Sequence, residues 1–227
     1  MQHKIDNVLI IIQARVSSTR LKHKIFLELS NYECWYLVYK RLNLLFNNII
    51  FAIPDNDENL ELYKKIKEKK INVFRGLEDN VLKRYIDALD YFGFNNFVRI
   101  CADNPYTCPY EIKKLIKRHN TKSTDYSYNN APINNLYPDG FGGEFSSLDV
   151  LKKIYKFTSK SEREHIFNYI KNNKNKFKIK TFNPSIQRYR RPDLNFEINT
   201  KEDYNKLVSI KLNWKLSMEQ ILERCLN

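Results

Sequence analysis

Short apolar segments alternate with helical patterns through the first half of the chain, and this alternation constrains the fold more than any other feature. Four segments read as buried strands, at residues 8–12, 48–53, 72–74 and 96–101. Apolar residues at helical spacing lie between them, at Trp35, Val38, Tyr39 and Leu42 and at Val81, Leu82, Tyr85, Ile86 and Leu89. Such βαβ units build a parallel sheet with helices on its faces, so we predict an α/β fold with a mainly parallel sheet.

The second half of the chain is less regular. Residues 129–143 are rich in Asn, Pro and Gly, which is typical of a loop. We predict helices at 147–157, at 162–172 and from residue 201 onward, and strands at 177–182 and 194–198. The chain has 227 residues and no internal repeat, so we expect one domain over 1–227.

Composition and charge narrow the class of protein. The apolar run 8–12 is too short for a leader or a membrane span, and the four cysteines show no CxxC pair, so we expect a cytoplasmic protein without a membrane partner. The formal net charge is +13, but the surplus lysines are mixed with Asn, Ile and Tyr along the chain. No basic stripe or RNA-reading motif stands out, so we expect no nucleic-acid partner.

The first strand runs directly into a loop with hydroxyl and basic side chains, at residues 13–24. Ligands of open α/β sheets collect at the carboxyl ends of strands, where backbone N–H groups and positive charge can hold phosphates. From the residues alone, an exposed basic loop explains this segment equally well.

The same loop resembles the opening signature QARxxSTRLPGK of the cytidylyltransferase family. This family includes CMP-Kdo synthetases, acylneuraminate cytidylyltransferases and SpsF-like spore-coat polysaccharide proteins. Lys22 and His23 replace its Pro and Gly. The resemblance implies catalytic roles for Arg15 and Lys24, and it implies nucleotide contacts for Gln13, Ala14, Arg15, Ser18, Thr19, Arg20 and Lys24.

Two further segments resemble family motifs that concern the nucleotide. Residues 75–85 are similar to RGxxxDVLxRY, with Asn80 for Asp, and the resemblance implies nucleotide contacts for Arg75, Asp79 and Arg84. Residues 99–105 resemble RxTADCPL, which implies a catalytic, nucleotide-binding and metal-binding role for Asp103. A carboxylate at the end of a buried strand suits Mg²⁺, which combines one or two carboxylates with substrate phosphates.

The remaining motifs concern the acceptor and the metal. Residues 137–145 are similar to FPDGLDVE and residues 162–166 to REHV, which implies acceptor contacts for four residues: Asp139, Glu144, Arg163 and His165. A turn explains Asp139 equally well, and alone His165 reads as a packed histidine. Residues 192–204 resemble DIRxTVDTPEDL, with Asn195 for Arg and Asn199 for the second metal-binding Asp, so Glu197 is expected to assist Asp103 and Asn199.

The resemblance spans residues 8–205 and implies a Rossmann-like three-layer nucleotidyltransferase fold. Region 125–185 is expected to be an inserted part that shapes the acceptor site and a homodimer. The implied function is transfer of CMP from CTP to a sugar acid or related acidic metabolite with Mg²⁺, releasing pyrophosphate, for surface-glycan synthesis. Two alternatives stay open: a glycosyltransferase of related fold, which would need a DxD-like metal motif near the end of a middle strand, and a nucleotide-binding homologue impaired in catalysis.

Overall fold

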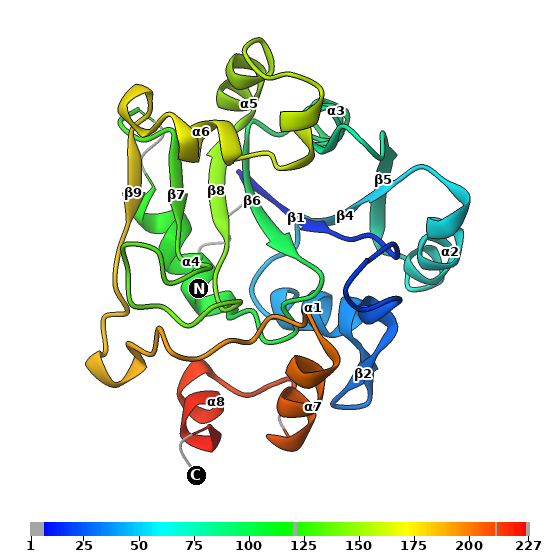
Figure 1. Ribbon diagram of the computed structural model, residues 1–227, viewed down its shortest axis with the longest axis vertical. Coiled ribbons are helices and arrows are strands. Elements are labelled where there is room, and N and C mark those ends of the chain that lie inside the picture. Colours follow the sequence, from blue (N-terminus) through cyan, green and yellow to red (C-terminus); the bar gives the residue numbers. More distant parts are fainter. Residues whose placement is uncertain (1–6, 120–121, 212, 226–227) are drawn as a thin grey trace.

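A seven-stranded sheet forms the centre of the protein in a computed structural model that describes residues 7–119, 122–211 and 213–225. Its strand order is β5-β4-β1-β6-β8-β7-β9 (Figure 1). Only β8 runs against its neighbours, because it pairs antiparallel with both β6 and β7. This confirms the predicted mainly parallel sheet. The strands are β1 (Val8–Gln13), β4 (Ile49–Pro54), β5 (Asn72–Gly76), β6 (Asn96–Cys101), β7 (Tyr126–Tyr128), β8 (Glu144–Ser147) and β9 (Ile179–Thr181).

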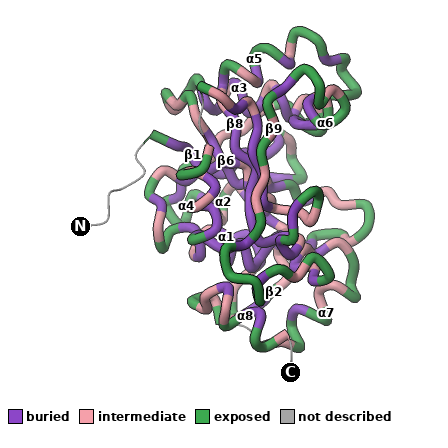
Figure 2. The backbone as a smooth tube through the Cα atoms, turned by 90° about the vertical axis from the view of Figure 1, so that its left-hand side faces the viewer, coloured by how far each residue is buried: buried purple, intermediate pink, exposed green. Residues whose placement is uncertain are grey.

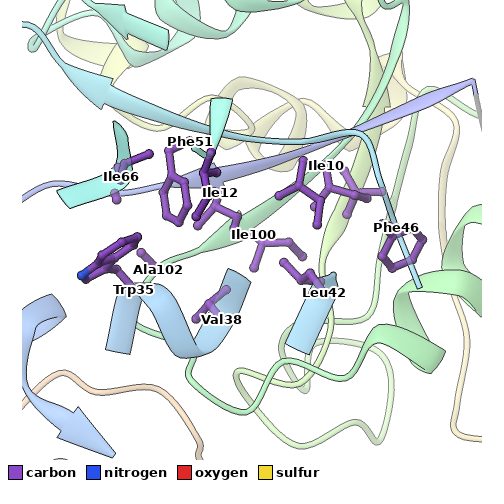
Figure 3. Close-up of a cluster of buried hydrophobic side chains, with 14 of the residues drawn as sticks. Ile10, Ile12, Trp35, Val38, Leu42, Phe46, Phe51, Ile66, Ile100 and Ala102 are labelled. Atoms are coloured by element: carbon purple, nitrogen blue, oxygen red, sulfur yellow. The ribbon is translucent and has the colours of Figure 1, made fainter. Parts of the chain in front are cut away.

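Helices cover both faces of the sheet and give the predicted three layers. One face packs against α1 (Cys34–Leu42), α2 (Leu60–Glu68) and α4 (Pro109–Arg118). The other face packs against α3 (Val81–Phe92), α5 (Leu148–Tyr155) and α6 (Asn168–Asn172). Figure 3 shows the first of these contacts, where side chains of α1 meet those of the central strands.

The continuous apolar run of β1 follows from this double coverage. Ile10 and Ile12 point into the core beneath α1, whereas Leu9 and Ile11 point into the core beneath α3. All four side chains are at most 1% exposed. Figure 2 shows the buried backbone gathered in these central strands, with exposed segments at the periphery.

A third apolar cluster joins the C-terminal part of the chain to α1 and to loop 129–143. It includes α7 (Lys201–Ser209) and α8 (Met218–Arg224), so the predicted single C-terminal helix is two helices. The small elements are the hairpin β2 (Glu28–Leu29) and β3 (Tyr32–Glu33), and the 3-10 helices η1 (Lys24–Phe26), η2 (Asp57–Asn59), η3 (Ser161–Glu164), η4 (Lys174–Lys176) and η5 (Gln187–Tyr189). No helix in the described ranges is both long and apolar enough to cross a bilayer.

Two predicted elements are wrong. Residues 194–198 are extended but form no strand, because their only ladder contact is one isolated bridge between Asp139 and Asn195. The helix predicted at 162–172 is interrupted: η3 ends at Glu164, and His165 is extended, with φ −115° and ψ 98°. This break turns the next two side chains, Ile166 and Phe167, into the core beneath α3.

Candidate active site

A cavity of about 240 Å³ opens where β1 and β6 end at the same edge of the sheet. Its lining comes from the loop after β1, the start of α3, the end of β6, the segment after η3 and the segment after η5. Eleven of the predicted site residues line it: Gln13, Ala14, Arg15, Ser18, Thr19, Arg20, Lys24, Arg84, Asp103, His165 and Glu197. The structure therefore brings together five sequence segments that the motifs had linked only by resemblance.

Lys24 ties three of these segments together. Its ammonium forms an ion pair with Asp103 and donates a hydrogen bond of 2.7 Å to the carbonyl oxygen of Ile198. Lys24 follows His23, which has φ 55° and ψ 22°. This left-handed conformation favours glycine, which the family motif has at this position. The loop backbone thus suits the family's glycine although the residue is histidine.

Carboxyl groups gather around Lys24. Burial, followed by the charge of Asp103, raises the pKa of Glu197, and the same two causes raise the pKa of Asp139. Asn199 lies next to Glu197 and hydrogen-bonds to it, yet the Asn199 Oδ1 atom is buried without a partner in the described part of the chain. Lys24 forms an ion pair with Asp103, and its charge partly offsets the rise in the pKa of Glu197.

The oxygen donors fit a hard divalent cation that also binds substrate phosphates. As the side chains stand, the described residues contain no group of three or more His, Cys, Asp or Glu that could hold a metal ion. Mg²⁺ requires fewer, because one or two protein oxygens plus phosphates and water complete its shell. The Asp103 carboxylate and the unpartnered Oδ1 of Asn199 are such donors, with Glu197 beside them.

Arg84 is a buried cation in the cavity wall. The residue is 2% exposed and donates to the carbonyl oxygen of Leu77 at 3.1 Å, while its Nε atom has no partner among the described residues. Burial, with a smaller effect from the charge of Arg15, lowers the pKa of Arg84 to about 10. A buried guanidinium without a carboxylate is costly, so an anion or a carbonyl oxygen of a ligand would stabilise it.

Other predicted site residues lie outside the lining. Arg75 forms an ion pair with Asp55 and lies over the ring of Tyr63 at 4.9 Å. Asp79 is exposed just before α3, and Asn199 hydrogen-bonds to Glu197 without lining the cavity. Asp139 bonds through its backbone to the segment 194–196.

Glu144 and Arg163 make structural contacts instead of lining the cavity. Glu144 is 1% exposed and binds Arg99, Lys171 and Tyr126. Arg163 donates to the carbonyl oxygens of Tyr155 and Thr158 at 3.1 and 2.8 Å. Their predicted contact with the acceptor would require these partners to be released or would be indirect.

Sequence reasoning missed four lining residues with chemical capacity: Glu78, Arg99, Cys101 and Glu164. The sequence did contain a signal for Arg99, which is a charged residue in the mostly apolar strand 96–101. Side chains alternate between the two faces of a strand, so Arg99 is expected on the same face as Cys101, two residues later, and Asp103, four residues later. Glu164 lies in the segment that resembles REHV, but the resemblance assigned roles only to Arg163 and His165 in that segment.

Comparisons with known proteins agree with this geometry. The sequence model of the family described as Cytidylyltransferase matches residues 9–222. The chain is 29% identical to the spore coat polysaccharide biosynthesis protein SpsF of Bacillus subtilis, over 90% of this chain and 86% of that protein. A cytidylyltransferase structure from Leptospira borgpetersenii superposes with a TM-score of 0.86 at 25% identity, covering 96% and 92% of the two chains. CMP-2-keto-3-deoxy-manno-octonic acid synthetase complexed with CTP shares the fold, with a TM-score of 0.63 at 12% identity over 90% and 98% of the chains.

Proposed function

Because the chain belongs to the cytidylyltransferase family and is a nucleotidyltransferase, we propose that it transfers CMP from CTP to a sugar acid or a related acidic metabolite and releases pyrophosphate. The observation that carries the proposal is the convergence of the basic loop after β1 with Asp103 in one cavity. The nucleotide assignment is supported by the synthetase of the same fold, which was solved with CTP. The relation to SpsF supports a role in polysaccharide synthesis.

In the proposed reaction a hydroxyl of the acceptor attacks the α-phosphorus of CTP, and the bond to pyrophosphate breaks. Arg15, Arg20 and Lys24 would hold the triphosphate and stabilise the charge on the leaving pyrophosphate. Arg84 would complete the nucleotide contacts from α3. Positioning and electrostatics suffice, so no covalent enzyme intermediate is needed.

A Mg²⁺ ion is proposed at Asp103, with Glu197 and the Oδ1 atom of Asn199 as further donors. When bound, the ion would neutralise phosphate charge. Lys24 forms an ion pair with Asp103 in the structure and would also be available to a phosphate oxygen. His165 would face the acceptor from the segment after η3.

Two of the three asparagines that depart from the family motifs have structural roles. The Oδ1 atom of Asn80 accepts a hydrogen bond from Lys83 N at 2.9 Å and caps α3, as an aspartate would. The Oδ1 atom of Asn195 accepts from Glu197 N at 2.8 Å. Asn199 alone retains an unpartnered oxygen, so a binder impaired in catalysis is the second candidate, and it rests on this residue.

The test is pyrophosphate release from each of the four NTPs with Mg²⁺, in the presence of a panel of sugar acids and sugar phosphates. Release with CTP and one acid is the expected result. If no pyrophosphate is released across the panel although CTP still raises the melting temperature, two explanations remain. Either the acceptor is outside the panel, or the missing carboxylate at Asn199 limits the reaction. Asn199→Asp separates them, because this variant gains activity only if a missing carboxylate limits the reaction.

We also propose a homodimer formed through region 125–185. β9 is an edge strand of the sheet. In the same region, Ile133 and Leu136 follow β7 and are 52% and 38% exposed. Exposed edges and apolar side chains favour association. A monomeric mass in light scattering would refute the dimer.

A further inference from the structure

Arg99 lies in the segment that resembles RxTADCPL, but the resemblance assigned a role only to Asp103 in that segment. The other four cations of the lining, Arg15, Arg20, Lys24 and Arg84, lie on the loop after β1 and on α3. Arg99 instead lies on β6, four residues before Asp103. Four residues of extended chain span at most about 13 Å, so the two residues are close to one another. Its side chain is 20% exposed, so it contributes to the cavity floor without being freely solvated.

Neighbouring side chains hold the Arg99 guanidinium in one orientation. Its Nε donates to Gln13 Oε1 at 2.9 Å, and its Nη1 forms an ion pair with Glu144. None of the hydrogen bonds within the described chain uses the Nη2 atom of Arg99. The guanidinium is therefore fixed on two sides and keeps a donor for a ligand.

The charges beneath the cavity do not cancel. Glu144 is buried and binds two cations, Arg99 and Lys171, the latter at 2.8 Å. Tyr126 donates its hydroxyl to the same carboxylate. Although burial alone would raise it, the charges of Arg99 and Lys171 lower the pKa of Glu144 to about 2. Arg99 thus shares the single charge of Glu144 with Lys171, whose side chain is 41% exposed, so Glu144 does not fully offset the charge of Arg99.

An acidic acceptor needs such a cation. Glu164, Glu197 and Asp103 line the same cavity and would repel it. We propose that Arg99 binds the carboxylate of the acceptor and so selects acidic acceptors, and that Glu144 is a positioning residue for its guanidinium. This inference rests on the proposed function. Guanidinium and carboxylate form charge-assisted hydrogen bonds with defined geometry, which a neutral acceptor cannot form.

The experiment measures binding, so it does not depend on turnover. Wild-type protein is loaded with α,β-methylene CTP and titrated calorimetrically with N-acetylneuraminate and with 3-deoxy-manno-octulosonate, each compared with its methyl ester. We expect the wild type to prefer one acid over its ester at least about tenfold. Arg99→Gln should abolish this preference and change the affinity for the CTP analogue less than about threefold.

Further variants separate the ligand role of Arg99 from a structural one. Lys171→Gln is the matched control, because it also removes a cation from Glu144 but does not line the cavity; it should keep the preference for the acid. Glu144→Gln should weaken the preference while Arg99 remains. Arg99→Lys keeps the charge but loses the planar fork, and it should show an intermediate preference even if Arg99→Gln fails to fold.

Three outcomes would overturn the inference. The first is an acid preference that Arg99→Gln and Arg99→Lys both retain in full. The second is a wild type that binds the CTP analogue but favours neither acid over its ester. The third is a loss of nucleotide affinity in Arg99→Gln as large as the loss of acid affinity, which would assign Arg99 to the nucleotide. A wild type that does not bind the CTP analogue refutes the proposed function itself, and this inference with it.

Discussion

Arg15 forms an ion pair with Glu164 at 3.2 Å, and both side chains line the cavity at about half exposure. The pair joins the loop after β1 to the last residue of η3. An anionic triphosphate that binds Arg15 must compete with this carboxylate. At the residue scale, Arg15 of the basic loop is therefore already paired with Glu164 before a nucleotide binds.

Removing this competitor should strengthen nucleotide binding. An exposed ion pair contributes about 0–1 kcal/mol, so Glu164→Gln should lower the Kd for CTP by about two- to fivefold in calorimetric titration. Glu162→Gln is the matched control, because Glu162 is two residues away and accepts hydrogen bonds from Ser159. Weaker CTP binding in Glu164→Gln would show that Glu164 helps to place Arg15.

His119 makes the stability of the fold depend on pH. Its ring stacks on Phe145 at 3.9 Å, and its Nδ1 lies 2.8 Å from Ser127 Oγ. Burial, followed by the charge of Lys180 and opposed by that of Asp125, lowers the pKa of His119 to about 4. At a pH below the ordinary pKa of histidine, His119 is protonated in the unfolded chain but stays neutral in the folded chain.

The free energy of unfolding should therefore fall as the pH decreases from about 6.5 to about 4, by about 1–3 kcal/mol from this residue. Urea unfolding at pH 7.5 and pH 5 measures the change. Carboxyl groups also titrate near the lower pH, so the difference between wild type and His119→Gln isolates the histidine. Equal pH slopes in the two proteins would contradict the assignment.

At the scale of elements, the sequence predicted best where both faces of a strand are buried. Three of the four N-terminal strands, β1, β4 and β6, were confirmed because their apolar runs lie inside a sheet that is covered on both faces. The fourth, β5, was also confirmed, although it is a partly buried edge strand. The strand predicted at 194–198 was wrong, because Leu194, Phe196 and Ile198 are buried at alternate positions as the residues of a strand would be. They pack instead into the cluster with α7 and α8, which needs no sheet neighbour.

The candidate site was predictable in part for a related reason. Motifs located the loop after β1 and Asp103, because these depend on chain segments that adjoin the first and fourth strands. The partners were not predictable, since Lys24 meets Ile198 over 174 positions and Arg99 meets Glu144 over 45. The second contact follows from the pairing of β6 with β8, in which Arg99 lies opposite Glu144. No local sequence pattern records either contact.

Loop 129–143 shows how a departure from the family pattern is accommodated. A Cβ atom on Gly142 would lie 2.1 Å from the carbonyl oxygen of Asn129 and 2.2 Å from its Oδ1. Asn129 in turn accepts from Gly143 N at 3.0 Å and donates to the carbonyl oxygen of Glu111 at 3.1 Å. No side chain fits at 142, where the motif FPDGLDVE that this segment resembles has an aspartate.

Gly142→Ala should therefore lower the free energy of unfolding by about 1–3 kcal/mol through steric overlap. Chemical denaturation of the purified variant measures this loss. Gly93→Ala is the comparison: Gly93 has φ +73° but open space around its Cβ position, so its cost is conformational alone, at about 1 kcal/mol. A Gly142→Ala variant as stable as the wild type would mean that the loop relaxes without loss.

At the scale of the whole molecule, the positive charge is less evenly spread than the composition suggests. Residues 152–180 contain ten Lys and Arg against two Glu, which accounts for eight of the thirteen surplus charges. This stretch includes the end of α5, then η3, α6, η4 and the start of β9, and through Glu164 and His165 it reaches the cavity. A polyanionic nucleotide would approach the cavity through this positive field.

Electrostatic attraction of this kind acts on the encounter and is screened by salt. For CTP, kcat/KM should fall about three- to tenfold between about 25 mM and 300 mM salt, while kcat changes less than about twofold. Reversing the charge of the exposed residues Lys156 and Lys160, beside η3, should reduce both kcat/KM at low salt and its salt dependence. The matched control reverses Lys64 and Lys67, which lie exposed on α2 against the opposite face of the sheet. Equal effects of the two double variants would mean that net charge alone attracts the nucleotide, whereas a larger effect beside η3 assigns the attraction to this stretch.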